Sequence, residues 1–158
     1  MQYLKEHGVK YIVHEHPAVF TVEEAEKVIT SMPGVMHTKN LFLKDGSGKF
    51  FLVCMNALRR LDLKALKDIL HAKKKLFFAS SEELKEKLHL TPGSVSILGM
   101  IYAQDVTLII DKEVWESERV GSHPNINTAT LELKHEDLEK FYHSLTTEKF
   151  ILELPLVL

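Results

Sequence analysis

The stretch "HTKNLFLKDGSGKFFLVCM", residues 37–55, carries the clearest local structural signal in the chain. Two runs rich in strand-forming residues flank the polar segment from Asp45 to Gly48. An Asp-Gly step between such runs is typical of a β-hairpin, because both residues tolerate the backbone angles of a tight turn. The stretch therefore predicts two antiparallel strands joined by a turn.

Side chains alternate along a strand, so the first arm of this hairpin has two distinct faces. Lys39 would share one face with Leu41 and Leu43, and Asn40 would share the other with Phe42. On these residues alone, the simplest interpretation of Lys39 is a charge that protects an apolar strand from aggregation. The alternative is a cation at the rim of a pocket, where it would bind a phosphate or carboxylate.

Helix signals are interleaved with strand signals along the rest of the chain. Helices are expected in "MQYLKEHG", after a capping box of Thr21 and Glu24, in "LDLKALKDILHA", after a second capping box of Ser80 and Glu83, and over about 136–145. Each of these segments combines a start or stop signal with apolar residues at helical spacing.

Further strands are expected in "VKYIVHEH", "KLFFA", "DVTLIID", residues 127–133 and "KFILEL". Because strands outnumber helices and the helices are scattered among them, we expect a single α+β domain over residues 1–158. Its sheet should be mixed and largely antiparallel, curled into a barrel-like shape with surrounding helices. The connections are too irregular for a doubly wound parallel sheet, and no Gly-rich phosphate fingerprint is present.

Composition excludes a general attraction to nucleic acid or membranes. The 158 residues are 45% hydrophobic and 27% charged, and 20 basic against 22 acidic residues give a net charge of −2. A nucleic-acid ligand would need a local basic patch. The best candidate is the run Lys73 to Lys75, although an ordinary solvated run is an equally good explanation.

The single cysteine and the absence of apolar targeting signals favour a cytoplasmic protein. One cysteine cannot form a disulfide within the chain, and Cys54 in "FFLVCM" is expected to be a small buried residue. No apolar run reaches membrane-spanning length, and the N-terminal residues lack the apolar core of a signal peptide.

Metal and serine-nucleophile chemistry are both disfavoured by spacing. Nine histidines are present, and His14 and His16 would share a strand face, but no third ligand stands at zinc-site spacing. A G-x-S-x-G elbow is absent. We therefore expect no metal and no cofactor, and a metal-dependent hydrolase is the least favoured of the functions considered.

Two glycine-containing turns, "TPGSVS" (residues 91–96) and "VGSHPN" (residues 120–125), are better candidates. Glycine allows the backbone to approach a ligand closely, and exposed N–H groups in such turns can bind an anion or a polarised carbonyl. Each turn taken alone is more often only a turn.

Four segments occur in an order that resembles a known family. They are "HPAVFTVEEA" (16–25), "KNLFLKD" (39–45), "PGSVS" (92–96) and "VGSHPNINTATL" (120–131). Together they resemble the YbaK/aminoacyl-tRNA synthetase-associated editing-domain family, in its freestanding prolyl-tRNA editing branch, over nearly the whole chain. The resemblance implies a mixed, barrel-like β-sheet and a deacylase that cleaves the ester of mischarged tRNA for proline. The wrong amino acid would be alanine, or cysteine as in a sister branch.

The resemblance also implies a site without a metal or a strong nucleophile. Lys39 would anchor the terminal phosphate or the substrate end, Asn40 would orient the substrate, and His123 would contact the substrate or a water. The catalytic set would be Lys39, Gly93, Ser94 and His123. The substrate-binding set would be His16, Pro17, Phe20, Thr21, Asn40, Val95, Ser96, Gly121, Ser122 and Asn125.

One position departs from the family pattern. The family loop commonly ends in proline, but Ile97 follows Ser96 here, which removes the fixed backbone angle of a proline ring. This departure supports an alternative function, an inactive relative that binds tRNA ends, an amino acid or a synthetase. The expected partner is the acceptor end of an aminoacylated tRNA, with prolyl-tRNA synthetase as a second candidate, while the oligomeric state is left open.

Overall fold

The computed structural model describes residues 2–17, 22–92, 95–122 and 128–157. Its helices are α1 (Gln2–Glu6), α2 (Val22–Thr30), α3 (Leu63–Leu70), α4 (Ser81–Leu88), the 3₁₀ helix η1 (Ile97–Tyr102), α5 (Lys112–Trp115) and α6 (His135–Ser144). Its strands are β1 (Ile12–Glu15), β2 (Met36–Lys44), β3 (Phe50–Asn56), β4 (Phe77–Phe78), β5 (Val106–Asp111), β6 (Arg119–Ser122), β7 (Ala129–Lys134) and β8 (Lys149–Leu152).

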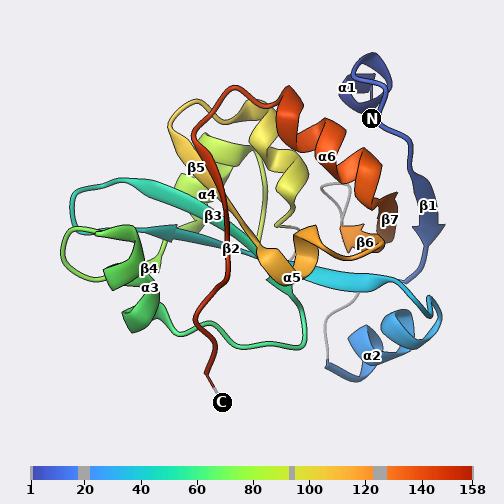
Figure 1. Cartoon of the computed structure of the whole chain (residues 1–158), viewed down its shortest axis with the longest axis horizontal. Helices are drawn as coiled ribbons and strands as arrows, with labels where there is room; N and C mark the ends of the chain where they lie inside the picture. Colours follow the sequence, from blue (N-terminus) through green and yellow to red (C-terminus); the bar gives the residue numbers. More distant parts are fainter. Residues whose placement is uncertain (1, 18–21, 93–94, 123–127, 158) are drawn as a thin grey trace.

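The strands form one mixed sheet in the order β1-β7-β6-β2-β3-β5-β8, with β4 paired to β2 (Figure 1). Pairs β1–β7, β6–β7, β2–β3 and β2–β4 are antiparallel, whereas β2–β6, β3–β5 and β5–β8 are parallel. The expected α+β class with a mixed, mostly antiparallel sheet is confirmed. The sheet does not close, because β1 and β8 end the strand order in the described part of the chain.

The hairpin predicted from residues 37–55 is confirmed. β2 and β3 pair from Thr38↔Asn56 to Lys44↔Phe50. At the turn, Asp45 Oδ1 accepts hydrogen bonds from the Ser47 N–H at 2.9 Å, the Ser47 hydroxyl at 2.7 Å and the Lys49 N–H at 3.0 Å. Gly46 is required for packing, because a Cβ there would lie 2.6 Å from Cβ of Lys74. One buried carboxylate therefore organises the turn.

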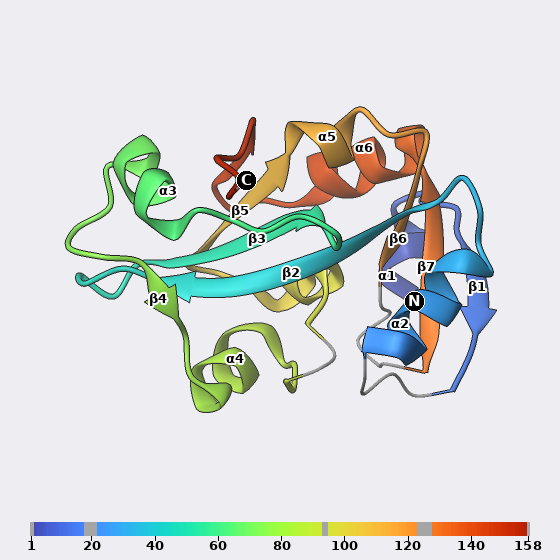
Figure 2. The same cartoon turned by 90° about the horizontal axis from the view of Figure 1, so that it is seen from below.

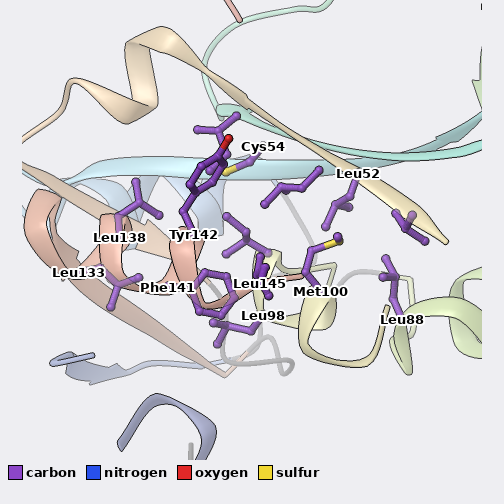
Figure 3. Close-up of a cluster of buried hydrophobic side chains, with 14 of the residues drawn as sticks. Leu52, Cys54, Leu88, Leu98, Met100, Leu133, Leu138, Phe141, Tyr142 and Leu145 are labelled. Carbon is purple, nitrogen blue, oxygen red and sulfur yellow. The ribbon is translucent and has the colours of Figure 1, made fainter. Parts of the chain in front are cut away.

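The two faces of the hairpin pack into two separate apolar cores. Phe42, Leu52 and Cys54 belong to the main core, which α4, η1 and α6 complete (Figure 3). Leu43 and Met55 face the other way into a second core under α3. This placement confirms the predicted burial of Cys54, and burial raises the pKa of its thiol from 9.0 to about 12.

Local signals located most of the helices. The Ser80–Glu83 capping box is present at α4, with the Ser80 hydroxyl accepting from the Glu83 N–H. The predicted cap at Thr21 lies outside the described residues. No helix among the described residues is long and apolar enough to cross a membrane.

Two segments differ from the sequence-based expectation. Gly121 and Ser122, expected in a turn, are the last residues of strand β6, where they pair with Glu132 and Leu131. The apolar run after Ser96 forms a 3₁₀ helix. Strand pairing decides the conformation of the first segment, and packing in the core decides that of the second. Local residue preferences carry no information about either contact.

We predict that Asp45→Asn destabilises the protein by about 2 kcal/mol at pH 7. Burial raises the pKa of the Asp45 carboxyl, but hydrogen bonds from the Ser47 hydroxyl and three backbone N–H groups outweigh it and lower the pKa from 3.8 to about 2. Because the folded-state pKa is below the unfolded value, the stabilisation is present above about pH 4 and is lost as pH falls through about 2. Urea unfolding between pH 2 and pH 7 measures it.

Asp105→Asn is the matched control, because Asp105 is an exposed carboxylate that pairs with Lys87 at 2.8 Å. An exposed ion pair contributes at most about 1 kcal/mol to the free energy of unfolding. Equal losses of stability in Asp45→Asn and Asp105→Asn would show that the Asp45 carboxylate does not organise the turn.

Candidate functional site

One face of the sheet around β6, β7 and β1 carries polar side chains, and the opposite face packs into the main core. His37 of β2 pairs with Gly121 of β6, which pairs with Glu132 of β7. Since side chains alternate, Lys39 shares the face of His37, and Thr130 shares that of Glu132. We call this set the polar face: His14, His16, His37, Lys39, Gly121, Thr130 and Glu132. In both views, α2 lies across β2 from α6 (Figures 1 and 2).

The His16 imidazole is held at both of its nitrogens. Nδ1 lies 2.9 Å from the carbonyl oxygen of Pro17, and Nε2 lies 2.9 Å from Oγ1 of Thr130. A carbonyl oxygen only accepts, so Nδ1 carries a proton, and in the neutral ring Nε2 then accepts from the Thr130 hydroxyl. The predicted pocket residues His16 and Pro17 are therefore joined by a direct hydrogen bond.

His14 makes a parallel contact one step along the same face. Its Nε2 lies 3.0 Å from Oε1 of Glu132, and Arg119 approaches the other carboxylate oxygen at 3.5 Å. His14 and His16 lie on the same side of the sheet, as predicted, although β1 ends at Glu15 and His16 follows it. Within the described residues, no three His, Cys, Asp or Glu side chains form a group that could hold a metal ion.

Gly121 is closely packed between strands on the polar face. A Cβ at this position would lie 3.0 Å from Cγ2 of Thr130 and 3.3 Å from Cγ1 of Val35, with Nδ1 of His37 at 3.6 Å. Gly121 was predicted to form a wall of the site, and the structure supplies a packing reason for glycine at this position.

Lys39 is half-buried at the edge of the polar face. Burial, and then the neighbouring Arg60 guanidinium, lower the pKa of its ammonium group below 10.5. Arg60 comes close because the loop after β3 folds back on β2, where the Ala57 N–H donates to the His37 carbonyl at 2.9 Å. Two cations thus lie near each other at this end of β2.

Asn40 and Ser122 face the other side of the sheet. The Ser122 hydroxyl lies 3.3 Å from that of Thr38, which also donates to the Gly121 carbonyl at 2.7 Å. Asn40 shares the Thr38 face by alternation, and its Oδ1 is buried without a hydrogen-bond partner in the described part of the chain. The sheet therefore separates the side chains of these two predicted residues from that of Lys39.

The loop before η1 is anchored in the main core. Ser96 is fully buried, and its hydroxyl accepts from the Leu98 N–H at 3.1 Å as the cap of η1. Val95 is half-buried against the same core. Ile97, which replaces the family proline, is 1% exposed. Capping and burial thus constrain Ser96 and Ile97 at the position where a proline ring would otherwise fix the backbone.

The remaining predicted site residues lie outside the described residues. They are Phe20, Thr21, Gly93, Ser94, His123 and Asn125. The lysines of the basic run are exposed. The backbone of Lys73 is bound to the hairpin turn, through Gly46 N–H at 2.7 Å and the Asp45 carboxylate at 3.2 Å.

Sequence reasoning missed Thr130, Glu132 and Arg60 as neighbours of the predicted site. The alternation of Thr130 and Glu132 with three buried apolar residues in "ATLEL" is a signal that could have identified the first two. Arg60 lies in an irregular loop, and its approach to Lys39 depends on tertiary structure.

We predict that Gly121→Ala destabilises the protein by about 1–3 kcal/mol, because the added methyl overpacks the polar face. Thr130→Ser removes the Cγ2 methyl that the new group would meet. The double variant should therefore lose less stability than the sum of the single variants, as measured by chemical denaturation. Strict additivity would contradict this packing explanation.

We also predict that Arg60→Gln raises the pKa of Lys39, although it stays below 10.5 because burial persists. An NMR titration of the Lys39 side chain measures this shift. Arg59→Gln is the control, since Arg59 lies 3.8 Å from Glu113 and is not among the groups that shift Lys39. An equal rise in both variants would contradict the assigned Arg60–Lys39 interaction.

Comparison with known proteins identifies the family. Residues 16–141 match the family model described as "Aminoacyl-tRNA editing domain". Prolyl-tRNA editing protein ProX of Acetoanaerobium sticklandii is 39% identical over 141 residues, which cover 87% of this chain and 84% of that protein. Prolyl-tRNA synthetase associated domain-containing protein 1 of Danio rerio is 36% identical, covering 89% of this chain and 77% of that protein.

Solved structures share the fold. A hypothetical protein superimposes with a TM-score of 0.76 at 17% identity, covering 97% of this chain and 96% of that one. A protein proposed to be a trans-editing enzyme for prolyl tRNA synthetase gives 0.73 at 21% identity, covering 96% and 90%. The resemblance seen in the four motifs is confirmed, and with it the expected enzyme class, an aminoacyl-tRNA deacylase. The chain belongs to the aminoacyl-tRNA editing domain family.

Proposed function

We propose that this protein acts in trans on mischarged tRNA for proline and that its preferred substrate is Ala-tRNA(Pro). The observation that carries the proposal is the 39% identity to a prolyl-tRNA editing protein across most of both chains. Such a substrate fits the cytoplasmic location expected from the sequence. The name of the Danio rerio relative favours prolyl-tRNA synthetase as a partner.

The proposed mechanism uses positioning instead of a protein nucleophile. An aminoacyl ester is already activated, so holding the ester, placing a water and stabilising the oxyanion can suffice. Lys39 would bind the terminal phosphate, and the loop of Gly93 and Ser94 would line the ester. His123 would contact the substrate or the water, and the terminal ribose hydroxyl of the tRNA would assist.

Selection between alanine and proline is proposed to depend on size. A difference of one methylene in binding contributes only about 1–3 kcal/mol, so exclusion of the larger ring is the more effective device. His16, Pro17, Phe20 and Thr21 are assigned to this pocket, and the structure describes the first two of them. Ile97 is buried, so the residue that replaces the family proline is accommodated in the core, which favours the active enzyme over an inactive binding module.

The test is hydrolysis of Ala-tRNA(Pro) by the purified protein, with Cys-, Ser- and Pro-tRNA(Pro) compared at equal concentration. We predict that Lys39→Ala lowers kcat/KM by about 100-fold, as expected for losing a charged group that stabilises the reacting end. The activity should survive a chelator. Lys140→Ala is the control, since its ammonium lies on the surface, 3.5 Å from the Gly8 carbonyl.

Absence of turnover with every mischarged substrate would overturn the deacylase proposal and favour the binding-module alternative. Hydrolysis that disappears with the chelator would instead indicate a metal-dependent enzyme. Equal losses of kcat/KM in Lys39→Ala and Lys140→Ala would show that Lys39 does not belong to the site.

A further inference from the structure

We propose that Thr130 is a positioning residue that fixes the His16 ring as a rigid wall of the amino-acid pocket and so sets substrate size selection. This inference rests on the proposed function, which assigns His16 to that pocket. Nothing in the sequence motifs assigns a role to Thr130, and the role follows from its contacts.

The Thr130 hydroxyl is committed to His16. Thr130 is 3% exposed, so its hydroxyl is shielded from water, and Nε2 of His16 lies 2.9 Å from it. A buried hydroxyl without a partner is costly, which favours keeping this hydrogen bond. The Pro17 carbonyl holds Nδ1 at the same distance. These two bonds fix both the orientation of the ring and the position of its proton.

This arrangement restricts what His16 can do. With Nδ1 donating to a carbonyl and Nε2 accepting from a hydroxyl, neither nitrogen is available to take a proton from water or substrate while both bonds persist. The contribution left to the ring is its shape. A ring held at both ends can exclude a larger amino acid, whereas a ring free to rotate would yield to it.

Thr130 also allows its two functional groups to be tested separately. Its hydroxyl bonds His16, and its Cγ2 methyl is the group nearest to a Cβ placed on Gly121. Thr130→Val keeps the shape and removes the hydroxyl. Thr130→Ser keeps the hydroxyl and removes the methyl.

The first measurement is the ¹⁵N shift of Nε2 in the His16 ring near neutral pH. Nδ1 should stay protonated in every variant, because the Pro17 carbonyl is unchanged. The wild type and Thr130→Ser should show the shift of an Nε2 that accepts a hydrogen bond, and Thr130→Val should show the shift of an Nε2 that has lost the Thr130 donor. His14 is an internal control, because its Nε2 contacts the Glu132 carboxylate at 3.0 Å and so carries a proton. Its signals should be the same in all three proteins.

The second measurement is the ratio of kcat/KM for Ala-tRNA(Pro) to that for Pro-tRNA(Pro). Thr130→Val should lower this ratio by about tenfold, mainly by raising hydrolysis of the prolyl substrate, which is the scale of a lost size filter. Thr130→Ser should retain the wild-type ratio. A purely structural role would instead lower both activities together.

The proposal is overturned if Thr130→Val keeps the wild-type Nε2 shift and the wild-type ratio of kcat/KM values, or if Thr130→Ser behaves like Thr130→Val. A wild-type protein that hydrolyses no aminoacyl-tRNA would defeat the proposed function and, with it, the selectivity role. In that case the ¹⁵N measurement still decides whether Thr130 orients His16, so the two failures are distinguishable.

Discussion

The pairing of β2 with three other strands is the constraint on which the rest of the structure depends. β2 pairs with β3 from Thr38 to Lys44, with β4 at Leu43 and Lys44, and with β6 at Met36 and His37. In the described strand order, this short parallel contact with β6 joins the β1-β7-β6 part of the sheet to the remainder. A slip of one residue would exchange the two faces of β2 and move Lys39 toward the main core.

The same register explains how polar side chains tolerate burial beside an apolar core. Thr130 and Glu132 are 3% and 6% exposed, and burying such groups is costly unless they are hydrogen-bonded. Two histidines supply these hydrogen bonds. His14 of β1 contacts the Glu132 carboxylate, and His16, just after β1, contacts the Thr130 hydroxyl. A half-buried lysine lies on the same sheet face. Buried polar side chains that gather in one place, each with a hydrogen-bond partner, depart from the usual apolar composition of a core. Such departures are expected at functional sites.

Local signals predicted much of the fold because they act over a few residues. The Asp45–Gly48 turn fixes the hairpin, and Ser80 with Glu83 fixes the start of α4. The parallel contact of β6 with β2 joins residues about 84 positions apart, and no local preference reports such a contact. For this reason Gly121 and Ser122 were expected in a turn. The alternation of side chains along a strand correctly predicted that Lys39 and Asn40 lie on opposite faces of the sheet. The family motif places both residues in one site, because a motif specifies sequence positions and not sheet faces.

The described chemistry favours catalysis by positioning. The Cys54 thiol is buried, and burial raises its pKa to about 12, which leaves almost no thiolate at neutral pH. Both nitrogens of His16 are engaged by neighbouring protein groups. The Ser96 hydroxyl is inside the core as a helix cap. Each of these candidate nucleophiles or bases is held in a structural role. In the proposed site, a lysine beside hydrogen-bonded side chains would suit an activated ester, whose hydrolysis requires geometry and charge stabilisation more than a strong nucleophile.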